Sequence, residues 1–252
     1  MIPRQIFITG SPQHFKNETI KQSIATLRDA NPQHTIRLFG DQEQADFIRN
    51  TFGESMHQIY QSINPKYPAA RKDLWSYLVI YAFGGIYLDH KSTCSRPLDS
   101  ILIDREFVLS QWSNMPGEPF ENWGLHPGLW MLSGGEIVNW FFACVPRHPM
   151  LQQMIQGVLN RIKRYQATPE TTGRKGILET TGPIAWSHAF LQSHKNFKAS
   201  KDFHLINQRD LEIVYSVFDN GQTGFHLQHR HQDPNHYSRI NEPVVIGKER
   251  SR

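Results

Sequence analysis

Residues 69–89 constrain the fold more than any other part of this chain. A long apolar stretch predicts a buried helix, and Gly84-Gly85 then ends it, because glycine readily adopts the left-handed conformation of a helix cap. The short apolar run 86–88 predicts a buried strand that leads directly into Asp89. In open α/β sheets, ligands bind beyond the carboxyl ends of the strands. We therefore expect Asp89 to lie in a functional site.

The first half of the chain alternates strand and helix patterns. Strands are predicted at 5–10 and 35–41, and amphipathic helices at 17–30 and 42–52. Pro68 suits the first turn of the long third helix. This β-α-β-α order predicts a parallel sheet with right-handed crossovers.

The second half has a less regular pattern. Its apolar runs and proline positions predict strands at 107–110 and 129–132, helices at 137–144 and 150–165, and short edge strands at 204–206 and 243–246. Segment 219–241 is rich in Gly, His, Asn and Asp, which predicts a loop over one face.

Composition fits a soluble globular protein of 252 residues with a net charge of +4. The longest apolar run, 77–88, has 12 residues and is too short to span a bilayer. The amino terminus has no signal-peptide pattern, and two cysteines do not make a disulfide framework, so we expect a cytoplasmic location. The basic charge is compatible with peripheral contact with acidic lipid surfaces. Dense Lys/Arg is confined to the tail 248–252, which we expect to be disordered, and no nucleic-acid partner is expected.

The end of the predicted strand 86–88 carries charged residues. Side chains two apart on a strand point the same way, so paired carboxylates at that spacing hold a divalent cation that can bridge a diphosphate. Here Asp89 is followed by His90 and Lys91, so an ammonium occupies the second position.

The run 73–89 resembles the signature of glycosyltransferase family 32, the DXD-containing sugar transferases related to yeast initiation mannosyltransferase and bacterial capsule enzymes. The family pattern has an Asp at the position of Asp73, a Gly-Gly-Ile-Tyr run, and an acidic motif that begins 16 residues after that Asp, at Asp89. Weaker similarities lie at 2–6, 139–143, 148–149, 181–183 and 236–238.

This resemblance implies one GT-A-type α/β domain over residues 1–252, with a mostly parallel central sheet flanked by helices. It implies a nucleoside diphosphate sugar as donor, a saccharide hydroxyl as acceptor, and transfer with retention of configuration in polysaccharide or glycan synthesis. It also implies Mn²⁺ or Mg²⁺ bound by Asp89, with His236 near the metal.

The chain departs from the family pattern at two positions. Ser76 stands where relatives have an Arg that holds the donor sugar, and Arg71 or Lys72 lies about one helical turn away. Lys91 stands where relatives have an Asp. Its ammonium would repel a cation in the ordinary site, but it can itself neutralise a leaving diphosphate.

We assign each candidate residue a role on this basis. Asp89 and Lys91 are the expected catalytic residues. Arg71 and Asp73 are expected to hold the donor hydroxyls. The donor nucleoside is expected to be framed by Thr9, Gly10 and Asp41 at the ends of the first two strands.

Two alternative functions remain open. Lys91 and Ser76 are compatible with a nucleotide-sugar-binding relative that has lost catalysis. A histidine-rich loop is compatible with a metal-dependent hydrolase; its residues are His226, His229, His231, Asp233 and His236. For the acceptor, the candidates for stacking on a sugar are Trp112, Trp123 and Trp130.

Overall fold

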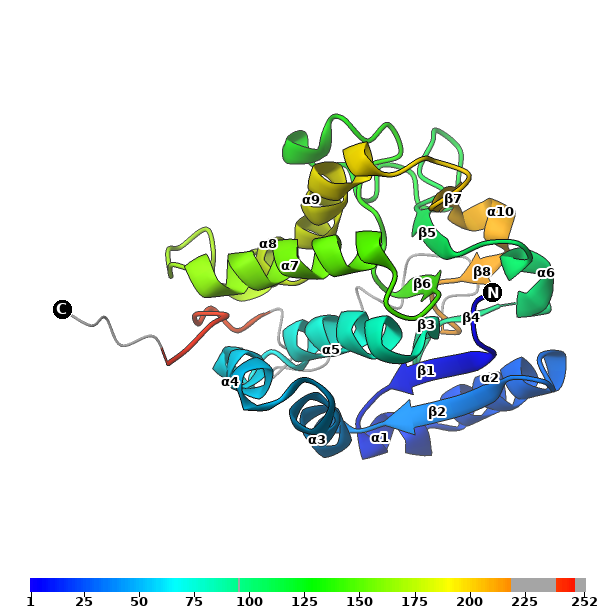
Figure 1. Ribbon diagram of the computed structural model, residues 1–252, viewed down its shortest axis with the longest axis horizontal. Helices are drawn as coiled ribbons and strands as arrows, with labels where there is room; N and C mark the ends of the chain where they lie inside the picture. The colour runs from blue at the N-terminus through cyan, green and yellow to red at the C-terminus, as the bar shows by residue number, and fades with distance from the viewer. Residues whose placement is uncertain (95, 219–238, 248–252) are drawn as a thin grey trace.

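A six-stranded sheet in the order β2-β1-β3-β6-β5-β7 forms the centre of the protein (Figure 1). The computed structural model describes residues 1–94, 96–218 and 239–247. The strands of the sheet are β1 (Gln5–Thr9), β2 (Thr35–Phe39), β3 (Gly85–Asp89), β5 (Phe107–Gln111), β6 (Phe141–Cys144) and β7 (His204–Asn207). Strands β4 (Thr93–Cys94) and β8 (Ile213–Val214) form a separate antiparallel pair.

Helices surround this sheet. They are α1 (Pro12–Lys16), α2 (Glu18–Ala30), α3 (Asp41–Phe52), α4 (Glu54–Ser62), α5 (Pro68–Phe83), α6 (Leu98–Leu102), α7 (Pro149–Arg164), α8 (Gly173–Thr180), α9 (Pro183–Ser193) and α10 (Gln208–Leu211), with 3₁₀ turns η1 (Pro127–Leu129) and η2 (His194–Asn196). Across the described ranges, none of these helices has both the length and the apolar character needed to cross a bilayer.

The sheet is mixed but mostly parallel. Strand β1 pairs in parallel with β2 and β3, and β5 pairs in parallel with β7. Strand β6 lies between β3 and β5 and is antiparallel to both. All strands of the sheet except β6 therefore run in one direction, which confirms the predicted mostly parallel α/β architecture.

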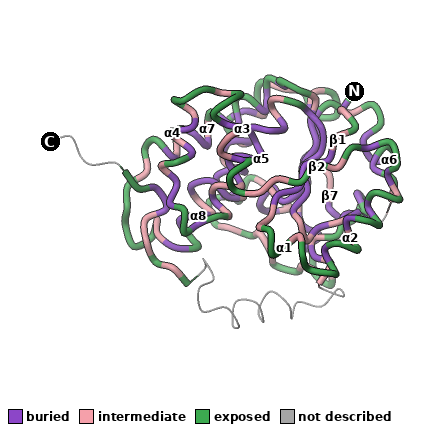
Figure 2. The backbone as a smooth tube through the Cα atoms, turned by 90° about the horizontal axis from the view of Figure 1, so that it is seen from below, coloured by how far each residue is buried: buried purple, intermediate pink, exposed green. Residues whose placement is uncertain are grey.

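Alternation along the strands divides the core into two layers. Phe7, Tyr87 and Phe142 face the layer that contains α3, α5, α7 and α9. Ile8 and Leu88 face the opposite layer, which contains α2 and α6. Figure 2 shows the resulting buried centre with exposed residues around it. Asp89 and Thr9 follow Tyr87 and Phe7 by two residues, so they point toward the α5 side of the sheet.

The turn from α5 into β3 requires glycine at two successive positions. Gly84 has φ +64°, and a Cβ on it would lie 2.6 Å from Cδ of Pro146. Gly85 has φ +105°, and a Cβ there would lie 2.6 Å from the carbonyl oxygen of Gln5. Since both residues combine a positive φ with a close approach of neighbouring chain, a side chain at either position would displace the helix from the strand.

The predicted helix 137–144 is wrong. Residues Phe141–Cys144 form β6, in which every residue is buried. A strand that is covered on both faces shows no alternation, and a short run of this kind resembles a buried helix segment in sequence. Hydrogen-bonded pairing with β3 and β5 makes this run a strand instead of a helix.

Two predicted strands are also corrected. Segment 129–132 begins at the last residue of the η1 turn and does not join the sheet. Residues 243–246 make only isolated bridges, to Ile63 and Thr172. Strand β7 confirms the prediction at 204–206. Most of the predicted loop 219–241, and the tail 248–252, lie outside the described residues.

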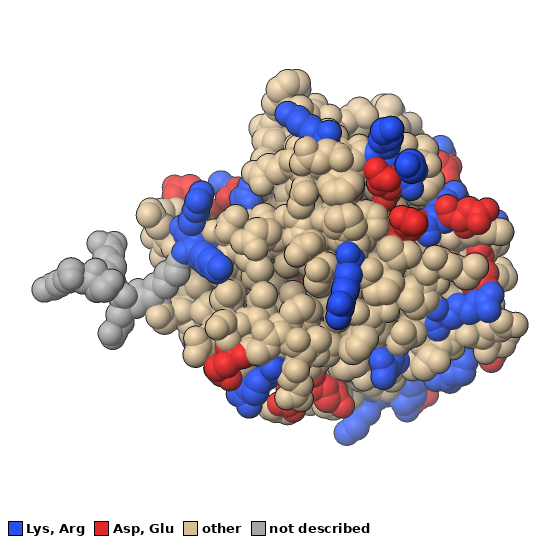
Figure 3. Space-filling model, viewed as in Figure 1, with Lys and Arg blue, Asp and Glu red and all other residues tan. Residues whose placement is uncertain are grey.

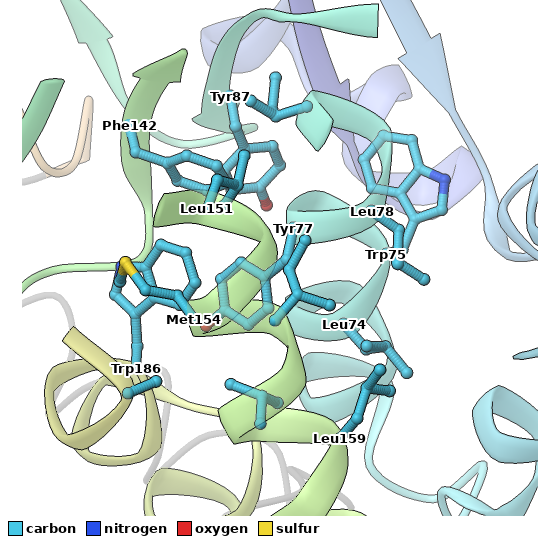
Figure 4. Packing of buried hydrophobic residues seen from close by; sticks show 14 of the residues in the cluster. Leu74, Trp75, Tyr77, Leu78, Tyr87, Phe142, Leu151, Met154, Leu159 and Trp186 are labelled. Carbon is cyan, nitrogen blue, oxygen red and sulfur yellow. The ribbon is translucent and has the colours of Figure 1, made fainter. Parts of the chain in front are cut away.

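A stack of two aromatic rings joins α5 to α9 in the larger core layer (Figure 4). The rings of Tyr77 and Trp186 are 4.1 Å apart with an interplanar angle of 1°, and both side chains are fully buried. The Tyr77 hydroxyl donates to the carbonyl oxygen of Thr181, 2.8 Å away. This stack therefore fixes the loop before α9 against α5.

We expect Trp186→Ala to lower the free energy of unfolding by about 3–5 kcal/mol, because it removes a fully buried indole ring from this packed layer and leaves a cavity. Urea denaturation measures the change. Trp130→Ala is the matched control, since Trp130 is 81% exposed and its loss should change stability by no more than about 0.5 kcal/mol. Equal effects of the two substitutions would contradict the role assigned to the stack.

Candidate active site at the carboxyl edge of the sheet

The ends of three parallel strands meet at one edge of the sheet. In the strand register Thr9 pairs with Phe39 and with Asp89, so β1, β2 and β3 end at the same level. Gly10 follows β1, and Asp41 begins α3 just beyond β2. The structure thus brings the strand-end residues Thr9, Gly10 and Asp89 together, with Asp41 exposed at the same edge.

Asp89 is a buried, ionised carboxylate. Its Oδ1 atom accepts hydrogen bonds from Nζ of Lys72 at 2.8 Å and from the hydroxyl of Tyr87 at 2.7 Å. Burial opposes ionisation, but the nearby positive charges of Lys72 and Lys91 outweigh it and hold the pKa of Asp89 well below its usual range. Asp89 therefore carries a negative charge throughout the physiological pH range.

Asp73 is the second buried carboxyl group of the site. Its Oδ1 atom accepts from Nδ2 of Asn139 at 2.9 Å, and its Oδ2 atom accepts from the hydroxyl of Thr181 at 3.1 Å. Burial raises the pKa of Asp73 to about 6, and the charge of Asp89 adds to the rise, against the opposing effects of Lys72 and the two hydrogen bonds. The two carboxyl groups therefore have opposite pKa shifts.

The geometry of α5 and β3 explains why these groups meet. Lys72 precedes Gly84 by 12 residues, and Asp89 follows it by 5. A helix rises about 1.5 Å per residue and a strand about 3.3 Å, so the chain travels about 18 Å along the helix and about 16 Å back along the strand. The beginning of α5 and the end of β3 consequently lie at the same level.

Lys91 lies against an aromatic ring. Its Nζ atom is 4.4 Å from the centre of the Tyr215 ring and donates to the Tyr215 hydroxyl at 3.1 Å. The β4–β8 pair and a hydrogen bond from Ser92 to the Tyr215 carbonyl hold this ring in place. A cation over an aromatic face keeps its charge, so the ring positions Lys91 without neutralising it.

His90 is a neutral imidazole at the same edge. Burial lowers its pKa to about 3 despite the opposing charge of Asp89. Its Nδ1 atom lies 3.2 Å from the carbonyl oxygen of Thr9, which indicates that this nitrogen carries the proton. The exposed ring of His14 stacks on it at 4.2 Å. His90 therefore adds an aromatic surface and no charge.

Arg71 and Lys72 contact different parts of the protein. Nε of Arg71 donates to the carbonyl oxygen of Ile63 at 2.9 Å, and its guanidinium lies over the ring of Tyr60. These contacts hold the end of α4. Of the two cations considered for the missing arginine, the structure places Lys72 beside Asp89. Ser76 is fully buried, and its hydroxyl donates to the Asp73 carbonyl.

Several site residues escaped the sequence analysis as functional candidates. The sequence could have indicated Tyr87, because it precedes Asp89 by two residues and therefore lies on the same face of the strand. Asn139 and Thr181 lie in the weakly similar segments 139–143 and 181–183, which pointed to no role for either residue. Tyr215 had no signal, since it reaches the site from a segment that is distant in sequence. His236 lies outside the described residues, as do the other four members of the histidine-rich loop.

The described residues do not fit the divalent cation that the family resemblance implies. Asp89 is paired with Lys72, and Lys91 stands at the second acidic position. Within 1–94, 96–218 and 239–247, no three His, Cys, Asp or Glu side chains gather as ligands of a metal ion. This part of the site therefore supplies positive charge instead of a set of metal ligands.

We expect Asp73→Asn to stabilise the protein more at pH 7.5 than at pH 4, by about 2 kcal/mol. Folding raises the pKa of Asp73 from 3.8 to about 6, so the wild-type carboxyl costs little stability below pH 4 and progressively more as the pH rises through 6. Urea denaturation of both proteins at the two pH values measures the difference. A gain independent of pH would show that Asp73 titrates normally.

Comparison with known proteins shows which proteins this chain resembles. Residues 17–108 match the family described as the glycosyltransferase sugar-binding region containing the DXD motif, and this range includes Asp73 and Asp89. The UDP-bound glycosyltransferase domain of the YGT toxin has a similar fold, with a TM-score of 0.50 and 8% identity over 86% of this chain and 81% of that one.

Two curated relatives come from Schizosaccharomyces pombe. The initiation-specific alpha-1,6-mannosyltransferase is 24% identical over 86% of this chain and 54% of its own length. Inositol phosphoceramide mannosyltransferase 1 is 26% identical over 75% of this chain and 51% of its own length. The chain thus spans about half the length of these relatives. Residues 17–108 thus resemble the sugar-binding region of DXD-containing glycosyltransferases, and the chain has a GT-A-like fold.

Proposed function

We propose that this chain transfers a hexosyl group from a nucleoside diphosphate sugar to a hydroxyl of a saccharide, with retention of configuration. The observation that carries this proposal is the placement of Lys72, Asp73, Asp89 and Lys91 at the shared end of β1 and β3. In an α/β sheet this edge is where ligands bind, and the charges there suit a diphosphate and a sugar.

Stabilisation of the leaving diphosphate is the main chemical demand of the reaction. The bond from the sugar C1 to the diphosphate oxygen breaks, and negative charge accumulates on that oxygen. Lys91, positioned by Tyr215, and Lys72, paired with Asp89, supply positive charge at this point. Asp89 thereby acts through Lys72, and it sets the position of that ammonium.

The sugar and the acceptor complete the proposed reaction. Asp73 accepts hydrogen bonds from the donor hydroxyls and orients the ring, while Thr9, Gly10 and Asp41 frame the nucleoside. Asp73 is itself held by Asn139 and Thr181, so it suits positioning better than nucleophilic attack. The acceptor oxygen therefore attacks C1 on the face that the diphosphate leaves, and its proton passes to the departing diphosphate.

Mannose is the first sugar to test, because both Schizosaccharomyces pombe relatives compared above are named as mannosyltransferases. A role in glycan or polysaccharide synthesis is part of the same proposal. We also propose that residues 1–252 act as one domain, because the strands of the central sheet come from residues 5–207. A reducing, cytoplasmic environment is part of the proposal, and it fits the burial of both Cys94 and Cys144.

One face of the molecule is shown with its charged residues in Figure 3. Most of this face is uncharged, one Lys or Arg side chain stands near its centre, and several Lys and Arg side chains lie along its lower right margin with acidic side chains among them. Small anionic substrates are part of the proposal, and the expectation that no nucleic acid is bound stays a prediction from the sequence.

A screen of nucleoside diphosphate sugars by thermal shift, with and without Mn²⁺, is the direct test. A true donor should raise the melting temperature in a concentration-dependent manner. Transfer to saccharide acceptors is then measured with that donor. The rival function, a binding protein without catalysis, is motivated by Lys91 and Ser76, and it predicts donor binding with neither transfer nor slow hydrolysis.

Asp89→Asn should lower the rate of transfer by about 100-fold or more, because the amide cannot hold the Lys72 ammonium by charge and one preorganised charge at the diphosphate is lost. Steady-state kinetics measure this change, and circular dichroism checks the fold. Asp29→Asn on the exposed face of α2 is the control and should keep wild-type kinetics. A near-wild-type rate for Asp89→Asn would refute the assignment.

Lys91→Asp should make donor binding dependent on Mn²⁺, because it restores the paired carboxylates that hold a divalent cation. Calorimetry with the corresponding nucleoside diphosphate should show binding by the wild type in the presence of EDTA. The variant should bind about 10–100-fold more weakly in EDTA and recover with Mn²⁺. Loss of wild-type binding in EDTA would instead show that the wild type uses a metal ion.

A further inference from the structure

A second feature of this edge is a groove in the loop between β5 and β6. Its volume is about 380 Å³. The residues that line it are Leu125, His126, Pro127, Leu129, Trp130, Leu132, Ser133 and Gly135. The groove residues thus come from one stretch of the chain, and none of them belongs to the proposed donor site.

Trp130 presents its ring to solvent at this groove. It is 81% exposed, whereas Trp112 is only 5% exposed. Trp112 and Trp123 pack against one another and against Tyr215, and Trp123 is partly buried. Of the three tryptophans considered for acceptor stacking, Trp130 is the most exposed.

A buried carboxylate holds a polar side chain in the groove wall. Nε2 of His126 lies 2.8 Å from Oε2 of Glu136. The other oxygen of Glu136 accepts from Nε1 of Trp112 at 2.9 Å, and Glu136 is buried. An aromatic face beside a fixed polar group suits a sugar ring, whose C–H face is apolar and whose edge carries hydroxyls.

The short segment 136–140 links the groove to the carboxyl pair. Glu136 supports the groove wall, Asn139 binds Asp73, and the carbonyl of Trp140 accepts from the backbone N–H of Asp89 at 3.0 Å. Three residues of chain span at most about 11 Å even when fully extended, so the backbones of Glu136 and Asn139 lie no farther apart than that.

A second chain of contacts runs between the same two places. Glu136 holds Trp112, the Trp112 ring meets the Tyr215 ring edge-on at 4.9 Å, and Tyr215 positions Lys91. Because these contacts are buried or partly buried, the loop cannot shift without moving Lys91. The groove is thus held at a fixed position relative to the charges of the donor site.

We propose that the groove around Trp130 binds the acceptor saccharide, one or two sugar units away from the hydroxyl that is glycosylated. This inference rests on the proposed function. Trp130 stacks on the sugar, and His126 accepts or donates a hydrogen bond at its edge. The groove then sets which acceptor length is used, since a monosaccharide cannot occupy the groove and the transfer position at the same time.

Trp130→Ala tests the proposal in the full chain. The acceptor is whichever di- to tetrasaccharide of mannose, galactose or N-acetylglucosamine accepts sugar from the wild-type protein. We expect the acceptor KM to rise about five- to tenfold, with kcat and donor affinity unchanged, because one stacking contact is lost. Trp130→Phe should recover most of the acceptor affinity. The preference of the wild type for longer acceptors over monosaccharides should disappear in Trp130→Ala.

Met115→Ala is the matched control, since Met115 is 58% exposed on the same loop but does not line the groove. Its acceptor KM should stay at the wild-type value. An unchanged acceptor KM in Trp130→Ala would overturn the assignment. If Trp130→Ala also loses binding to phosphatidylinositol vesicles while its KM stays unchanged, the groove contacts a lipid surface and not the acceptor. If the wild type transfers to no saccharide with any donor, the proposed function itself fails, and the acceptor assignment fails with it.

Discussion

The site depends on the reversal of the chain at Gly84-Gly85. This turn sends the polypeptide from the end of α5 straight into the centre of the sheet, with no intervening loop. The helix and the strand then have nearly equal lengths between the turn and the site, so Lys72 and Asp73 face Asp89. Any residue with a Cβ at the turn would meet backbone or proline atoms within 3 Å. The local geometry of two glycines thus sets the distance between the charges on which the proposed chemistry depends.

Electrostatic balance is the second constraint. Two carboxyl groups lie buried near one another, and burial alone would favour the protonated form of both. Lys72 and Lys91 keep Asp89 ionised, whereas Asp73 retains a pKa of about 6. A protein that holds one firmly charged and one readily protonated carboxyl beside two ammonium groups is suited to bind an anion next to a hydroxyl-bearing ring. This arrangement also gives a physical reason for Lys91. A second aspartate at that position would need a bound cation to neutralise it, whereas the lysine supplies the positive charge itself.

The antiparallel strand β6 and the segment before it connect the parts of the molecule. Residues 136–140 contact the groove wall, Asp73 and Asp89 in turn, and then continue into the sheet between β3 and β5. The aromatic contacts of Tyr215 add a path from the groove loop to Lys91. The proposed donor and acceptor regions therefore share one wall, which suits a transfer between two bound molecules.

The sequence by itself determined the mostly parallel α/β class, the helix–glycine–strand unit, and the position of Asp89 at a strand end, because these follow from local periodicity and from the conformational freedom of glycine. It assigned the donor hydroxyls to Arg71 instead of Lys72, and it mistook β6 for a helix. Only the tertiary structure shows that Lys72 pairs with Asp89 and that residues 141–144 form a strand. Asn139, Thr181 and Tyr215 reach the site through packing between segments up to 124 residues apart, and no local pattern encodes such contacts. The choice of Lys72 over Arg71 likewise depends on the end of α4, which occupies the guanidinium and leaves the neighbouring ammonium to pair with Asp89.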